Sequence, residues 1–177
     1  MNIKNNLCMG LLCVMILMAT GCQQGHVDSY SDPQFDPATV NSYAWLPNGS
    51  LALGVVPQNQ AVIEHTLQAT IDQSLQARGW RLQDPNSADV LVRFVVGAES
   101  TYEVKKTGIT NVAGEQVEVP VEMKKLRSGR IAIDLIDTPT RRIVWRGVTG
   151  GSQEGVPSQE QAADKVRRAV QAIFGKL

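Results

Sequence analysis

The sequence predicts an α+β domain in which a mainly antiparallel β-sheet carries two α-helices packed on one face. Two segments have an apolar stripe at helical spacing, one in the middle of the chain and one at its C-terminal end. Several short β-prone runs lie before and between them, most of them joined by short links. Short links favour antiparallel neighbours, and two striped helices need a common apolar partner, which one face of the sheet would supply.

The N-terminal segment has the layout of a signal peptide. A short polar stretch precedes an apolar run from Leu7 to about Ala19, which is shorter than the roughly 20 apolar residues of a transmembrane helix. Residues 19–22, Ala-Thr-Gly-Cys, resemble the bacterial lipobox, although leucine is usual where Ala19 stands. The resemblance implies that residues 1–21 are a lipoprotein signal peptide and that Cys22 is the lipidation site. An uncleaved anchor and ordinary secretion are the alternatives.

The residues after the cysteine bear on location. Gln23 follows Cys22, and in Gram-negative lipoproteins a residue other than aspartate there generally permits transport to the outer membrane. Acyl chains contribute about 0.8 kcal/mol per buried methylene, so several chains anchor a protein stably. We therefore expect lipid anchoring to the periplasmic face of the outer membrane, with the membrane as one partner. Residues 22–37 are polar and lack periodicity, which predicts a flexible tether that leaves His26 solvated.

Charge and cysteine placement exclude several kinds of site. The 17 basic and 17 acidic residues cancel and aromatic residues make up 5% of the chain, so the sequence lacks the basic surplus and the stacking side chains expected of a nucleic-acid-binding protein. All three cysteines, Cys8, Cys13 and Cys22, lie near the N-terminus. The single α+β domain that we expect over residues 38–177 can therefore form neither an internal disulfide nor a cysteine metal site.

The first half of this domain predicts a strand, a helix and a strand. Residues 42–46 form a short β-prone run that ends at a Pro-Asn-Gly turn. Residues 58–78 repeat an apolar residue at every fourth position and end before Gly79, which is typical of a helix. Residues 90–96 are apolar on both alternating faces except at Arg93, which predicts a central strand.

The second half predicts a hairpin and a final helix. Ile131–Leu135 and Ile143–Val148 are two runs of alternating pattern around a short turn, the clearest hairpin in the chain. Ser158 and Gln161 form a capping box at the start of the last helix. Its apolar stripe consists of Ala162, Val166, Ala169, Val170 and Ile173.

The region from Tyr102 to Arg127 allows two interpretations. It contains polar residues of both signs and a run, Val117–Met123, whose odd positions are all apolar. Pro120 confines this run to an edge or a bulge because proline cannot donate to the ladder. The region is either a protruding β-hairpin that contacts a partner, or a sheet segment whose stripe completes the core while Pro120 protects an edge strand.

Two tryptophans are candidate core residues. Trp45 and Trp145 lie in short strands, where a large ring can bury on the order of 200 Å². We therefore interpret them as packing residues rather than as a surface for ligand stacking. Gly147 suits a bulge or a close approach of neighbouring backbone.

No catalytic constellation is recognisable. Ser152 has a glycine two residues before it but Glu154 two residues after it, which breaks the Gly-x-Ser-x-Gly elbow of hydrolases. A metal site would have to use His26 and His65 with carboxylates, without a closely spaced histidine pair. We expect no catalytic residue, no metal and no other cofactor, and we interpret His65 as an exposed helical residue.

Acidic residues leave one alternative. Asp134 and Asp137 lie at one strand end, and carboxylate pairs serve in glycoside and metal chemistry, although such pairs are frequent by chance. Arg93 and Arg146 either face solvent or pair with Asp134 or Asp89 across strands. We therefore retain two functions, a non-catalytic envelope module that binds a protein, lipid or wall component, and a periplasmic hydrolase that uses acidic residues.

Several motifs together resemble a known family. They are the lipobox, the terminal amphipathic helix, Phe35-Asp36, Tyr43–Pro47, Gly79-Trp80, Ala88–Val92, Ile133–Asp137 and Val144–Gly147. This set resembles the bacterial lipoproteins of domain of unknown function 4136, over nearly the whole mature chain. The resemblance implies an envelope location and a fold, and it supplies no established activity or catalytic residues.

Overall fold

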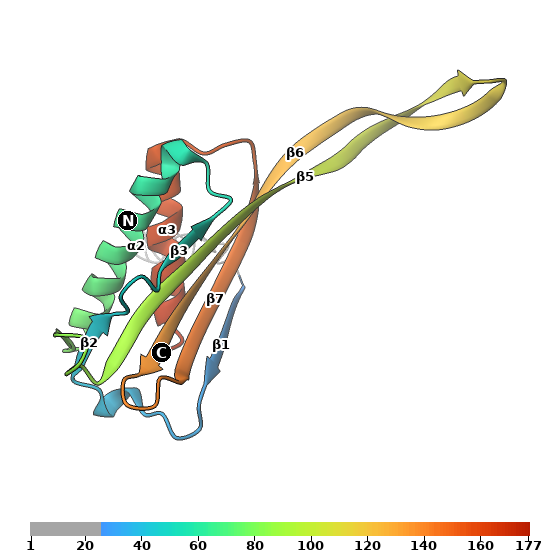
Figure 1. The fold of residues 1–177 in the computed structure, drawn as a ribbon. Coiled ribbons are helices and arrows are strands. Elements are labelled where there is room, and N and C mark those ends of the chain that lie inside the picture. Colours follow the sequence, from blue (N-terminus) through green and yellow to red (C-terminus); the bar gives the residue numbers. More distant parts are fainter. Residues whose placement is uncertain (1–25) are drawn as a thin grey trace, which may run out of the picture.

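The computed structural model describes residues 26–177, apart from the side chains of Val112 and Pro120. The expected signal peptide and Cys22 lie outside the described residues. The described chain forms two layers, a seven-stranded sheet and two helices, α2 (Pro57–Gln76) and α3 (Gln159–Phe174), that cover one of its faces (Figure 1). Neither of these helices is long and apolar enough to cross a membrane.

The seven strands follow the chain in pieces of very different length. They are β1 (Val27–Ser31), β2 (Ser42–Trp45), β3 (Leu51–Leu53), β4 (Arg81–Leu82), β5 (Val90–Val112), β6 (Glu115–Asp137) and β7 (Ile143–Glu154). Their spatial order is β1-β7-β6-β5-β2-β4, and β3 also pairs with β5. A short 3-10 helix, η2 (Pro37–Thr39), lies between β1 and β2.

The sheet is mixed, which corrects the expectation of a mainly antiparallel one. The pairs β1–β7, β5–β6 and β6–β7 are antiparallel, but β2–β4, β2–β5 and β3–β5 are parallel. The cause is the long connection through α2, because a helical crossover returns the chain in its original direction. The predicted strand–helix–strand unit of the first half therefore forms a parallel pair rather than an antiparallel one.

The expectation of a flexible tether over residues 22–37 is wrong for its described part. Val27–Ser31 form the edge strand β1, which pairs with β7 from Val27 opposite Thr149 to Ser31 opposite Trp145. All but one of its side chains are exposed, so the strand is held by backbone hydrogen bonds rather than by apolar burial. A polar sequence without alternating apolar residues does not predict such a strand.

Strands β5 and β6 form one long hairpin that leaves the body of the domain (Figure 1). The sequence predicted separate short runs here, because the apolar alternation is interrupted. The pairing instead continues from Val90 opposite Asp137 to Val112 opposite Glu115. Ala113 and Gly114 close the hairpin with φ angles of 53° and 89°, the left-handed conformation that tight two-residue turns require.

The core lies between the helices and the sheet. Leu67, Ile71 and Leu75 on α2 and Val166, Val170 and Ile173 on α3 pack against Val92, Ile133 and Leu135. Trp145 on β7 is 2% exposed and stacks on Phe174, with ring centroids 5.9 Å apart. Gly147 permits this contact, because a Cβ atom there would lie 2.5 Å from Ile173 and 2.6 Å from Trp145. The core role of Trp145 is confirmed, and Trp45, which is half-buried, contacts Phe94 edge to face.

Replacing Trp145 with alanine should therefore lower the free energy of unfolding by about 3–5 kcal/mol, the range for deleting a buried large aromatic side chain. Denaturant melts of the purified domain measure this loss. Tyr30→Ala is the control, because Tyr30 on β1 is 54% exposed and its loss should change stability little. A loss below about 1 kcal/mol for Trp145→Ala would contradict the packing interpretation.

Candidate functional site

Three charged residues form a row across the sheet on the face away from the helices. Arg93, Asp134 and Arg146 are cross-strand neighbours on β5, β6 and β7. The Asp134 carboxylate accepts hydrogen bonds from Arg93 Nε at 2.7 Å and from Arg146 Nε at 2.5 Å and Nη2 at 2.9 Å. The Asp134 side chain is 1% exposed, and the arginine side chains are 31% and 41% exposed. The pairing of both arginines with Asp134 is confirmed.

This environment keeps Asp134 ionised. Burial opposes ionisation, but the hydrogen bonds from Arg146 and Arg93 outweigh it and lower the pKa of the Asp134 carboxyl below its ordinary value. A general acid needs a raised pKa, so Asp134 is unsuited to that role. Asp137 accepts hydrogen bonds from the backbone N and the hydroxyl of Thr140, at 2.9 and 2.5 Å, and closes the turn before β7. The pair thus gives the hydrolase alternative no support.

The other candidate groups lie apart. His65 is exposed on α2, and His26 is exposed and bonded to Asp28 at 2.9 Å. Asp89 accepts hydrogen bonds from the backbone N atoms of Asn41 and Ser42, so it fixes the entry of β2 rather than pairing with an arginine across the sheet. In the part of the chain that the structure describes, no group of three His, Cys, Asp or Glu residues could hold a metal ion.

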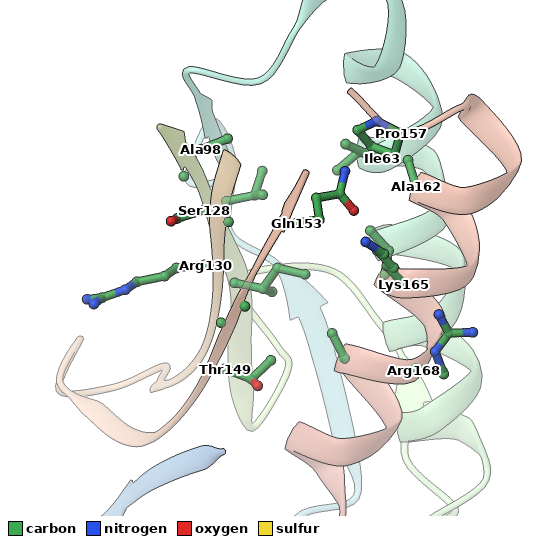
Figure 2. A pocket seen from close by; sticks show the side chains of 18 of the residues that line it. Ile63, Ala98, Ser128, Arg130, Thr149, Gln153, Pro157, Ala162, Lys165 and Arg168 are labelled. Atoms are coloured by element: carbon green, nitrogen blue, oxygen red, sulfur yellow. The ribbon is translucent and has the colours of Figure 1, made fainter. Parts of the chain in front are cut away.

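A groove with a volume of about 950 Å³ lies between α3 and the sheet (Figure 2). This volume lies in the range of small-molecule sites, which are about 300–1,000 Å³. Ile63 on α2 and Ala162, Val166 and Ala169 on α3 line one side. The sheet residues that line the other side come from β5, β6 and β7.

The groove exists because one row of the sheet has almost no side chains. Ala98 lies opposite Gly129, and Gly129 lies opposite Gly151, so these residues form a continuous row across three strands. The preceding row on the same face, Val96–Ile131–Thr149, carries full side chains. A Cβ atom added at Gly151 would meet nothing within 4 Å, and one at Gly129 would meet only a backbone oxygen at 3.8 Å. The space is therefore open, unlike a packed core.

The charged residues that line the groove are all basic. They are Arg127, Arg130, Lys165, Arg168 and Lys176, and no aspartate or glutamate is among the lining residues. Figure 2 shows that the Arg130 side chain leaves the far side of the sheet, whereas Lys165 extends from α3 towards the groove. Because the whole chain has equal numbers of basic and acidic residues, this one-sided lining is a local feature.

Sequence reasoning missed the groove. Its floor comes from three segments that are far apart in the chain, and only the sheet register brings them into one row. Gly129 and the pair Gly150-Gly151 could have given a signal, because both lie just outside the predicted hairpin of Ile131–Leu135 with Ile143–Val148. Extending that hairpin would have placed glycine opposite glycine.

The outer part of the long hairpin is the third candidate site. Beyond the last pair of β6 with β7, residues 102–125 have only each other as β-ladder partners among the described residues, and we call them the arm. At its base, Lys124 forms an ion pair with Glu154 and the Lys125 carbonyl accepts a hydrogen bond from the backbone N of Gly155. Several apolar side chains on it are exposed, including Tyr102 at 63%, Ile109 at 73% and Met123 at 57%. The protruding hairpin is therefore confirmed, and the alternative that its stripe completes the core is wrong.

Asp134→Asn should lower the free energy of unfolding at pH 7 by about 2 kcal/mol, less than the 3–5 kcal/mol of a fully buried pair because the half-exposed arginines can turn to solvent. A lowered pKa in the folded state means that the stabilisation is present above the unfolded pKa, about 3.9, and is lost as the pH falls below it. Stability measured from pH 7 to pH 2 should fall less in the variant. The control is Asp164→Asn, which breaks an exposed ion pair with Arg167. It should change neither the stability at pH 7 nor the fall of stability between pH 7 and pH 2. Equal losses would contradict the special role of Asp134.

Comparisons with known proteins identify the family. The model of the family described as "Domain of unknown function (DUF4136)" matches residues 27–177. A DUF4136 family protein from Bacteroides thetaiotaomicron is 11% identical over 88% of this chain and 96% of its own, with a TM-score of 0.52, which supports the fold alone. Lipoprotein GNA1162 from Neisseria meningitidis is 10% identical over 77% of this chain and 99% of its own, with a TM-score of 0.41. The chain spans 35% of the length of a PDZ domain protein from Parabacteroides distasonis, which is 11% identical over 84% of this chain, with a TM-score of 0.45. No curated protein matches the sequence. With a match that covers all but the N-terminal segment, the chain belongs to the DUF4136 family.

Proposed function

We propose that the protein is a lipid-anchored, non-catalytic module on the periplasmic face of the outer membrane, and that it binds another envelope protein through the arm. The observation that carries the binding role is the exposure of the arm. A hairpin that packed on its own domain would bury its apolar residues, whereas Tyr102, Ile109 and Met123 all remain more than half exposed.

The backbone of the arm favours a protein as the partner. On β5 the pairing with β3 ends at Gly97, and on β6 the pairing with β7 ends at Leu126. Each strand of the arm therefore has one edge whose N–H and C=O groups can pair with an added strand. Pro120 removes one donor from β6, which leaves the β5 edge, Tyr102–Val112, as the better template.

The lipobox and Gln23 support the anchor and the outer-membrane location. The described chain begins at His26, only four residues after Cys22, so a lipid on Cys22 would hold the domain close to the bilayer.

Cys22→Ser should leave a chain without lipid that stays in its precursor form, because the thiol accepts the diacylglycerol that lipoprotein signal peptidase requires. Intact mass and membrane fractionation of the full chain measure both effects. Cys13→Ser is the matched control, since a residue within the signal peptide is removed from the mature protein. Equal mass and equal membrane release for wild type and Cys22→Ser would refute the anchor.

Charge reversal of Lys105, Lys106, Lys124 and Lys125 should weaken capture of the arm's partner without lowering the melting temperature, because rim charges influence association more than folding. The measurement compares the proteins that the lipidated wild type and variant capture from envelopes. Reversal of Arg141 and Arg142, exposed cations at the other end of β6, is the control and should change nothing. Identical partners for the arm variant and wild type would show that the arm is not the contact.

A further inference from the structure

We propose that the groove between α3 and the sheet binds a single-chain lipid with an anionic headgroup, of the lysophospholipid class. The inference goes beyond the proposed function, and only its argument about the source of the ligand rests on the lipid anchor at Cys22. The arm plays no part in it. Three independent features of the groove support the assignment: its apolar walls, the sign of its charges and its distance from the anchor.

The walls suit a flexible hydrocarbon chain. The row of Ala98, Gly129 and Gly151 forms a smooth floor that lacks side chains, and α3 contributes small residues opposite it, such as Ala162 and Ala169. A row of backbone and methyl groups presents no fixed polar side chain to an acyl chain along its length. Burial of the acyl methylenes in this space is the favourable contribution.

The charges suit an anionic headgroup. No carboxylate lines the groove, and Lys165 extends towards it from α3 (Figure 2). Arg127 lines the groove beside the same glycine row and donates a hydrogen bond to the carbonyl of Gly54, which holds its guanidinium in place. Neither Lys165 nor Arg127 forms an ion pair within residues 26–177. A phosphate group bound between them would supply the missing negative charge.

The N-terminus points to a membrane as the source of this lipid. Thr149 lines the groove, and its hydroxyl donates a hydrogen bond to the carbonyl of His26 at 2.9 Å. The four residues from Cys22 to His26 span at most about 14 Å when extended. An anchor on Cys22 therefore holds the groove next to the bilayer, where single-chain phospholipids dissolve. The other lipid within reach is the acyl group of Cys22 itself, which the experiment must distinguish.

The test uses the chain that starts at Gln23, because residues 26–177 contain every strand, both helices and the whole core described above. Native mass spectrometry and titration with lysophosphatidylglycerol measure binding, with lysophosphatidylcholine as the zwitterionic comparison. We expect the anionic lipid to bind about tenfold more tightly than the zwitterionic one. Lys165→Glu should abolish this preference and leave the binding of lysophosphatidylcholine unchanged.

Two variants test the location. Gly151→Leu and Gly129→Leu should each fill the floor and weaken both lipids by about tenfold or more, with an unchanged melting temperature because the space is open. Gly97→Leu is the matched control. Gly97 lines the groove with its backbone alone, and a side chain there would leave the opposite face of β5 with nothing within 4 Å, so binding should persist.

The remaining outcomes decide against the proposal. Equal affinity of wild type for both lipids, or binding that survives Gly151→Leu and Gly129→Leu in folded protein, overturns it. The proposal is also overturned if the chain that starts at Gln23 binds lysophosphatidylglycerol but the lipidated protein in nanodiscs of neutral lipid does not. In that case the acyl group of Cys22 would be the occupant of the groove. The intact mass of the lipidated protein tests the anchor separately, so a failed anchor and an unoccupied groove are distinguishable.

Discussion

The antiparallel pairing of β5 with β6 is the interaction on which the rest of this structure depends. Its register determines three different surfaces in turn. Near Val90 and Asp137 it supports the core, further along it aligns the glycine row under α3, and beyond Leu126 it becomes the arm. Because side chains alternate along a strand, a shift of one residue would move Ile133 to solvent and Asp134 beneath the helices. The charged row on the open face thus fixes the same register that the apolar core requires.

The continuity of this ladder also explains how an exposed hairpin can be ordered. An isolated two-stranded ribbon is marginally stable in water, since it buries little apolar surface. The arm begins instead from strands whose pairing is already fixed by the helices and by β7, so each further pair adds to an existing ladder. Its tip closes with Ala113 and Gly114 in the conformation that matches strand twist. Charges of both signs along the arm keep its open edges soluble.

The sequence predicted those elements that face a core and missed those that do not. Both helices and the hairpin around Asp137 are visible in the sequence, because burial imposes helical or alternating spacing on their apolar residues. The central strand at Val90 is visible because its run is apolar on both faces. Strand β1 carries no such pattern, since it is held mainly by backbone pairing with β7 and only Val27 packs against the core. The parallel direction of β2 follows from a crossover in space, which strand patterns do not encode. Of the candidate sites, the arm was foreseen as one of two options and the groove was not, because its floor is a row across strands.

The composition of that floor argues that the groove is more than a packing defect. Glycine inside a strand weakens the sheet, and the usual structural reasons for it are a left-handed backbone or a close approach by a neighbour. Gly147 has such a reason in the contacts of Trp145 and Ile173, and Gly114 has one in its positive φ. Gly129 and Gly151 have neither, since larger side chains fit above both. A sheet selected only for stability would carry apolar side chains there and bury them beneath α3. The row instead preserves an open volume next to the N-terminal strand, and this is the arrangement that a binding site requires.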